Sequence, residues 1–172
     1  MQNKLALITV RSGDPFEYQP QLRTIWPSPY AEKADEASRE YANTGEIMYV
    51  VYGGRVVGIT GIFFDEAAPH DVFLRWTGII EGFRRVGLGS AVIAGVAELC
   101  RKQYPNAIYL VELVPDNEYG HTVAKPFFEA LGFEPDIGVI PPSEDSEWPC
   151  IRYALNLKLE DSDMINRKDG TV

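Results

Sequence analysis

Alternating and helical hydrophobic patterns predict an ordered series of strands and helices in the first half of the chain. Leu5–Val10 is expected to be an opening strand. The segment EIMYVVYGGRVVGITGIFF predicts two strands joined at Gly53-Gly54, a pair that tolerates the positive φ angles of a tight hairpin turn. A further strand is expected over Asp71–Ile80. Prolines at 20, 27 and 29 precede YAEKADEASREYAN, whose pattern favours a solvent-exposed helix.

The second half of the chain continues this order. The run GSAVIAGVAELCRKQY predicts an amphipathic helix, because Val92, Val96 and Leu99 share one face. AIYLVELV predicts a strand, HTVAKPFFEALGF a short helix ended by Gly132, and CIRYALNLKL a last strand with alternate apolar residues on one side. We therefore expect one mixed α/β domain over residues 1–160, and a flexible tail over residues 161–172.

Composition narrows the partners and the compartment. The 172 residues carry a formal charge of -9, which opposes broad contact with nucleic acid or with anionic lipid. The N-terminal segment lacks a signal-peptide core, and no apolar run is long enough for a membrane span. The two cysteines are too few for a disulfide framework, and the two histidines are isolated from them, so no metal site is expected. These features favour a soluble protein of the cytoplasm.

The stretch GFRRVGLGSAVIAG carries the clearest chemical signal. A strand that runs through a glycine-bearing turn into a helix leaves unpaired amides at the helix N-terminus, where the helix dipole adds partial positive charge. Gly87 and Gly89 lack the Cβ atoms that would hold a phosphate away, and Arg84 and Arg85 can neutralise a second phosphate. A pyrophosphate is the expected ligand. A nucleotide P-loop is excluded because no lysine follows the second glycine, and the third glycine of a dinucleotide turn is missing.

Two motifs in this order resemble the GNAT superfamily of acyl-CoA-dependent N-acyltransferases. RRVGLG is similar to its Arg/Gln-x-x-Gly-x-Gly/Ala signature, and VELVPDNEYGHTVAKPFFEALGF is similar to its second motif, in which a strand leads into a helix that closes with LGF. The resemblance is good over Met48–Pro135. It implies a single-domain α/β fold with a twisted, mixed, mostly antiparallel sheet flanked by helices. The fourth and fifth strands would splay apart around acetyl-CoA.

The same resemblance assigns roles to particular residues. The backbone at Ile79 and Ile80 would pair with the pantetheine arm, and one amide there would polarise the thioester carbonyl. Asn117 and Phe128 would also lie at the coenzyme A site. The pyrophosphate would be held by the amides of Val86, Gly87, Leu88, Gly89 and Ser90.

Catalysis is the part in which the sequence departs from the family pattern. Glu112 resembles a glutamate that some members use as a base, although a lone strand carboxylate could equally be exposed or salt-bridged. Phe128 stands where much of the family has a tyrosine that protonates the leaving thiolate. Tyr119 and His121, in an inserted loop, are the displaced candidates for this acid, and unassisted departure of the thiolate is the alternative.

The acceptor is expected to be a small cationic amine, acetylated by a monomer or homodimer. The residues expected to shape its pocket are those near Trp26–Tyr30 and, in the acidic loop PPSEDSEWPC, Glu144, Asp145, Glu147 and Trp148. Two alternatives stay open, namely a non-catalytic acyl-CoA-binding module and an acetyltransferase of protein lysines or N-termini. A toxin that acts on aminoacyl-tRNA is disfavoured, because the chain lacks a basic stripe.

Overall fold

The computed structural model describes residues 4–10, 15–26, 45–136, 140–141 and 149–158. Strands within it follow the order β1-β2-β3-β4-β5-β7-β6 in one sheet. The chain divides into two compact units, residues 1–68 with 74–98 and residues 69–73 with 99–172. The predicted exposed helix after Pro29 and the predicted tail lie outside the described residues. Among those described, no helix has both the length and the apolar character needed to cross a bilayer.

The first unit is built on antiparallel strands. It contains β1 (Leu5–Thr9), β2 (Gly45–Tyr52), β3 (Arg55–Phe63) and most of β4 (Asp71–Ile79). Gly53 and Gly54 connect β2 to β3 with φ angles of 58° and 79°, which confirms the predicted hairpin turn. The hydroxyls of buried Thr60 in β3 and half-buried Thr77 in β4 form a hydrogen bond of 2.8 Å with each other.

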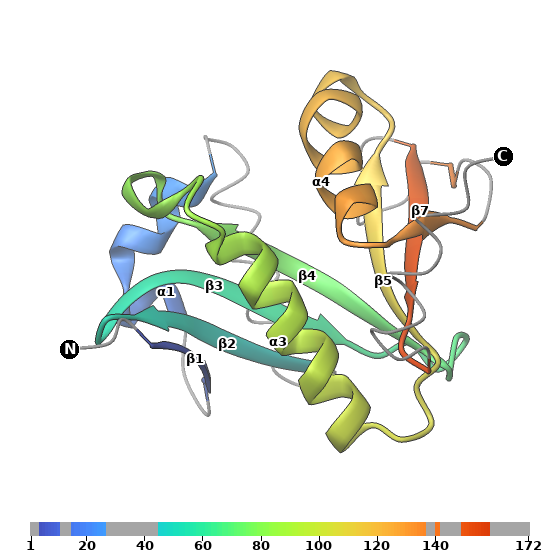
Figure 1. The fold of residues 1–172 in the computed structure, drawn as a ribbon, viewed down its shortest axis with the longest axis horizontal. Coiled ribbons are helices and arrows are strands. Elements are labelled where there is room, and N and C mark those ends of the chain that lie inside the picture. Colours follow the sequence, from blue (N-terminus) through green and yellow to red (C-terminus); the bar gives the residue numbers. More distant parts are fainter. Residues whose placement is uncertain (1–3, 11–14, 27–44, 137–139, 142–148, 159–172) are drawn as a thin grey trace, which may run out of the picture. The chain divides into compact units, whose positions relative to one another are not determined.

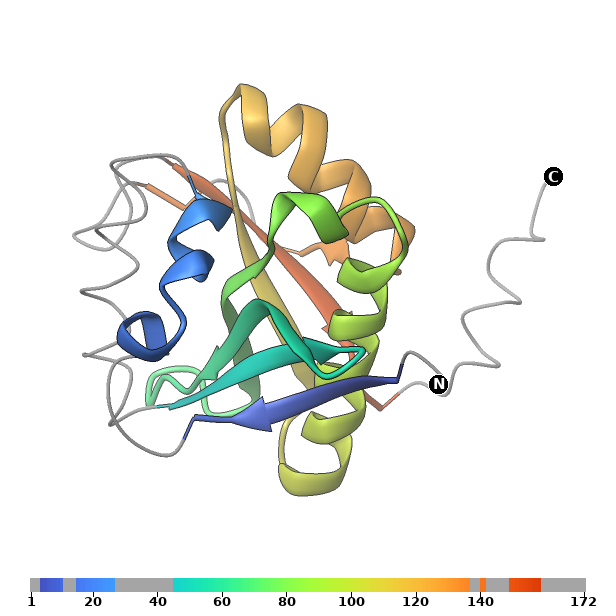
Figure 2. The same cartoon turned by 90° about the vertical axis from the view of Figure 1, so that its left-hand side faces the viewer.

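Helices cover both faces of this part of the sheet. The amphipathic helix α3 (Leu88–Gln103) crosses β2 and β3 on one face (Figure 1), with the buried side chains of Val92 and Val96 in the core. α1 (Pro15–Tyr18) and the 3₁₀ helix η1 (Pro20–Ile25) lie on the other face (Figure 2). There a second apolar cluster is formed by Phe16, Leu22, Ile25 and Ile59.

The second unit combines strands of both directions. β5 (Tyr109–Pro115) pairs along its full length with antiparallel β7 (Cys150–Asn156), and β7 also pairs with the short β6 (Glu134–Pro135). β4 and β5 are parallel, and their pairing covers only Asp71–Phe73 and Tyr109–Val111. The sheet is therefore mixed and mostly antiparallel, as predicted.

The last strand differs from the sequence prediction on one face. Tyr153 and Leu155 are buried, as the alternation indicated, but Arg152 on the opposite face is buried as well. Its guanidinium binds Asp71 through Nη2, 2.7 Å from Oδ2, and Asp136 through Nη1, and it lies over the ring of Tyr109. The strand pattern could not reveal this pairing, because the two acids come from distant segments. The network joins β4, β5 and β7.

Candidate functional site

The turn between β4 and α3 contains two residues in left-handed backbone. The short 3₁₀ helix η3 (Glu81–Phe83) follows β4, and Arg85 and Gly87 then adopt left-handed φ angles of 61° and 82°. Left-handed residues interspersed in a turn point successive amides into one concavity. A Cβ at Gly87 would meet nothing within 4 Å, so glycine is required there for its φ angle and not for space.

The amides at the start of α3 lack intrahelical partners. The amide of Ala91 makes the first bond, to the carbonyl of Gly87 at 3.0 Å. Within the described part of the chain, no acceptor is recorded for the amides of Leu88, Gly89 and Ser90. The helix dipole adds partial positive charge at the same point. The predicted phosphate site is thus not capped by described protein groups, and phosphate binding itself remains a prediction.

The two backbone amides at the end of β4 differ in their availability to a ligand. The amide of Ile80 donates to the carbonyl of Val57 in β3 at 2.9 Å, so it is already used within the protein. Ile79 is the neighbouring residue in extended backbone, and adjacent residues of a strand direct their amides to opposite sides. Of the two residues predicted to contact the pantetheine arm, Ile79 is therefore the one whose amide points away from β3.

The two arginines of the turn differ in their contacts. Arg84 donates from Nε to the carbonyl of Ile79 at 2.7 Å and from Nη2 to the carbonyl of Ile25 at 2.9 Å. No contact is recorded among the described residues for the exposed side chain of Arg85. The sequence predicted that both arginine side chains contact a phosphate group. The structure instead engages much of the Arg84 guanidinium with the protein's own backbone.

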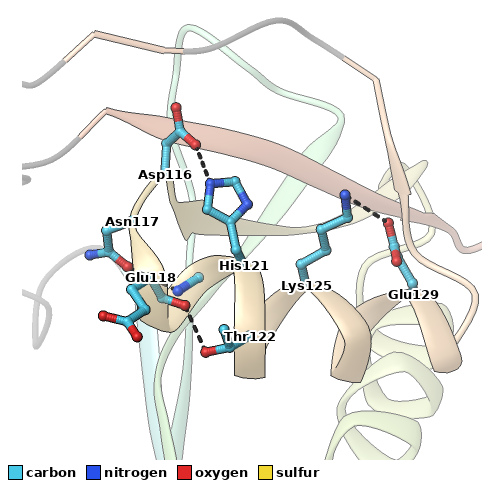
Figure 3. A network of polar contacts seen from close by, with 8 residues as sticks. Asp116, Asn117, Glu118, His121, Thr122, Lys125 and Glu129 are labelled. Carbon is cyan, nitrogen blue, oxygen red and sulfur yellow. Dashed lines mark hydrogen bonds and ion pairs between the residues drawn. The ribbon is translucent and has the colours of Figure 1, made fainter.

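The predicted helix after β5 is present, and it already includes residues that were also interpreted as an inserted loop (Figure 3). Gly120–Ala124 forms the π-helical segment η4, which continues into α4 (Lys125–Ala130). Pro126 explains the widened turn, because proline has no amide to donate and its ring would clash with the carbonyl four residues earlier. His121 therefore lies in the helix predicted to begin there, and Tyr119 directly precedes η4 in helical backbone, which corrects the expected inserted loop.

Close contacts fix this turn against the end of β5. A Cβ at Gly120 would overlap the carbonyl oxygen of Pro115, so only glycine fits. The side-chain oxygen of Asn117 accepts a hydrogen bond from the Gly120 amide at 2.9 Å. The backbone carbonyl of Asn117 accepts one from the His121 amide. At least the side-chain oxygen of Asn117 therefore has a local structural partner, and its predicted cofactor contact is untested.

His121 is paired with an acid that the sequence analysis missed. Its Nε2 lies 2.8 Å from Oδ1 of Asp116, while the His121 side chain remains 52% exposed (Figure 3). This contact orients the imidazole and places a proton on Nε2. The other ring nitrogen, Nδ1, does not take part in the contact with Asp116. Tyr119 is exposed. The missed signal was an aspartate five residues before a histidine, across the junction of a strand and a helix.

Phe128 is a core residue at the end of α4. Its ring centroid lies 5.1 Å from that of Phe127 and 5.2 Å from that of Phe133. Its carbonyl accepts from the Phe133 amide, while Gly132, at a φ of 87°, donates to Glu129. These bonds form a Schellman cap, for which the contact between the two flanking aromatic residues is typical. The predicted end of the helix at Gly132 is confirmed.

Glu112 lies on the side of the sheet that carries α4. It stands directly opposite Tyr153 in the β5–β7 register, and paired residues share a face. Tyr153 donates to Oε1 of Glu129 in α4 at 3.4 Å. Burial, followed by the charge and the hydrogen bond of Glu129, raises the pKa of the Tyr153 phenol. The role of Glu112 as a base is untested.

Most of the predicted acceptor region lies outside the described residues, including Glu144, Asp145, Glu147 and Trp148 and the segment after Trp26. Trp26 itself packs edge-on against Trp76 of β4, with ring centroids 5.5 Å apart. Trp76 has a φ of 50°, and its buried indole nitrogen has no hydrogen-bond partner among the described residues. This distortion of β4 was not visible in the sequence pattern.

Comparison with known proteins decides the family. The Acetyltransferase (GNAT) family model matches residues 17–133, which include both the turn before α3 and the helix α4. The chain belongs to the GNAT acetyltransferase family. The resemblance of the two sequence motifs to this family is thereby confirmed. None of the curated proteins matches the chain.

Solved structures support the fold of this GNAT chain at low sequence identity. A GNAT-family protein from Desulfovibrio desulfuricans has a TM-score of 0.71 at 17% identity, over 90% of this chain and 99% of that one. Aminoglycoside 6'-acetyltransferase type Ii has a TM-score of 0.68 at 19% identity, over 91% of this chain and 99% of that one. A GNAT acetyltransferase from Elizabethkingia anophelis with acetyl-CoA bound gives 0.64 at 15%, also over 91% and 99%.

Proposed function

We propose that this GNAT protein transfers an acetyl group from acetyl-CoA to a primary amine of a small cationic molecule. The observation that carries the proposal is the turn before α3, in which the amides of Leu88, Gly89 and Ser90 have no recorded acceptor and Gly87 has a positive φ. These groups fit a diphosphate, and the open space at Gly87 lets it approach the backbone. Coenzyme A carries such a diphosphate and supplies the acetyl thioester.

The chain's own groups would divide the chemistry between backbone and side chains. The amide of Ile79 would donate to the thioester oxygen, where one such donor commonly contributes about 100- to 1000-fold in rate. A primary amine of pKa near 10.4 must lose a proton before it attacks, and Glu112 is the candidate acceptor of that proton through water. His121, whose Nε2 is held by Asp116, is the candidate that, when its ring carries both protons, would give the Nδ1 proton to the leaving thiolate.

The nature of the acceptor rests on charge and on structural relatives. The chain has a formal charge of -9, which attracts cations at long range. Among the structural neighbours are an aminoglycoside 6'-acetyltransferase type Ii and an aminoglycoside 6'-N-acetyltransferase complexed with coenzyme A. Aminoglycosides are small polycationic amines, so these neighbours support the same substrate class for this chain.

A second function is favoured by one observation. Phe128, at the position of the usual tyrosine, is 8% exposed and packed in a helix cap, so no acid is available there. A non-catalytic acyl-CoA-binding protein would need none. This alternative predicts coenzyme A binding without release of thiol in the presence of any amine.

Ligand binding followed by a thiol assay tests the proposal. At a hundredfold excess over Kd, acetyl-CoA should stabilise the protein by about 2.7 kcal/mol, whereas ATP and NADH should not. Thiol release is then measured with a polyamine, an aminoglycoside, a lysine peptide and a neutral amine. We expect the small cations to react fastest and to lose rate as salt is added. Absence of stabilisation by acetyl-CoA would refute the cofactor site, and preference for the peptide or the neutral amine would refute the acceptor class.

A further inference from the structure

One arginine side chain joins the end of η1 to the end of β4. Nε of Arg84 donates to the carbonyl of Ile79, the last residue of β4, at 2.7 Å. Nη2 donates to the carbonyl of Ile25, the last residue of η1, at 2.9 Å. Both acceptors are backbone atoms within the first unit. A guanidinium holds two such acceptors in a fixed geometry, which a lysine ammonium cannot reproduce.

Packing shows that these two ends are fitted to each other. A Cβ at Gly78 in β4 would overlap Cγ2 of Ile25 and would lie 3.2 Å from Cζ2 of Trp26. Ile25 is buried, and Trp26 makes an edge contact with Trp76 at an interplanar angle of 83°. The last turn of η1 therefore lies directly on the last residues of β4, with no room for even one methyl group between them.

We propose that Arg84 is a positioning residue, which holds η1 against the end of β4 and so controls the approach of the acceptor amine. This inference rests on the proposed function, in which the thioester lies along the end of β4. Whatever packs on that strand end borders the carbon that the amine attacks. Displacement of Ile25 and Trp26 would then disturb amine attack, while the amides of Leu88–Ser90 would still hold the diphosphate.

Substitutions of Arg84 separate this role from a phosphate contact. We expect Arg84→Lys and Arg84→Met each to lower kcat/KM for the amine by about 10- to 100-fold, since small misplacements at a reacting centre have effects of that size. The Kd for coenzyme A should stay within about threefold of the wild-type value. Arg55→Met, at the exposed first residue of β3, removes the same charge and should change neither quantity.

Two results would overturn the proposal. One is a large loss of coenzyme A affinity in Arg84→Met that Arg84→Lys restores, because a phosphate contact needs only the charge. The other is unchanged kcat/KM for the amine in both variants.

Hydrogen exchange by mass spectrometry tests the contact without any activity. Amides of residues 21–26 should exchange at least about fivefold faster in both Arg84 variants, while the β2–β3 hairpin stays unchanged. Unchanged exchange at residues 21–26 would refute the proposed contact between Arg84 and η1. A wild-type protein that neither binds coenzyme A nor releases thiol would refute the proposed function instead, and the exchange result would still decide what Arg84 holds.

Discussion

The two turns that lead into α3 and into η4 with α4 solve different problems with the same residue type. At Gly87 the space around a Cβ is open, and the backbone needs glycine for a φ of 82°. At Gly120 a Cβ would overlap the carbonyl of Pro115, and the residue is helical, so space alone requires glycine. In the first turn the amides of Leu88–Ser90 have no acceptor among the described residues, whereas in the second Asn117 accepts from the amides of Gly120 and His121. The first turn keeps amides that a bound anion could use, as proposed, whereas the second uses its amides to hold the helix start.

The largest effect on stability should come from adding a side chain at Gly120, where a Cβ has no room. Gly120→Ala forces the helix start away from the end of β5, and we expect a loss of about 3 kcal/mol in the free energy of unfolding, typical of an overpacked site. For a chain of this length, that corresponds to a drop of about 6 to 12 °C in Tm. Thermal unfolding measures it. Gly82→Ala, where a Cβ meets nothing within 4 Å, is the matched control and should unfold like the wild type. Equal Tm values for the two variants would contradict the steric argument.

Substitution of Gly87, in the turn before α3, should change ligand affinity more than stability. Gly87→Ala places a Cβ in left-handed backbone at a cost of about 1 to 2 kcal/mol, which corresponds to roughly tenfold weaker binding of coenzyme A where the ligand requires that geometry. Gly87→Asn should lie between alanine and glycine, because asparagine tolerates this conformation better. Isothermal titration calorimetry gives the Kd values. If the Gly87→Ala variant and the wild type bind coenzyme A with equal Kd values, the φ angle of Gly87 is not what organises the site.

The same contrast explains what the sequence could reveal. Glycines at 53, 54, 87 and 132 mark positive φ angles, and such backbone requirements are local, so the hairpin, the turn before α3 and the end of α4 were all predictable. Pairings between distant residues were not. Arg84 with Ile25, Arg152 with Asp71, and the packing of Trp26 on Trp76 depend on tertiary contacts that no single-sequence pattern contains.

The start of η4 shows the limit most clearly. The sequence suggested Tyr119 and His121 as displaced acids and treated them alike. The geometry adds one fact about His121, whose Nε2 lies 2.8 Å from Oδ1 of Asp116, while both side chains are largely exposed. Pro126 carried a signal for the irregular helix, since its missing amide disrupts regular α-helical bonding, but the resulting π-helical register was not predictable from spacing alone.

The smallest effects on stability and on ligand binding should come from the side chains of the second turn, which give the finest test of the comparison. If His121 protonates the leaving thiolate, His121→Gln should lower kcat by about 10-fold or more with little change in the Kd of coenzyme A, since general acids contribute at least that much. Asp116→Asn should lower kcat less, because the imidazole remains and only its orientation is weakened. Tyr119→Phe should leave kcat unchanged. Steady-state thiol release and calorimetry separate the two quantities. Full activity in His121→Gln would mean that the thiolate leaves unaided, and a loss in Tyr119→Phe alone would transfer the acid to the exposed phenol.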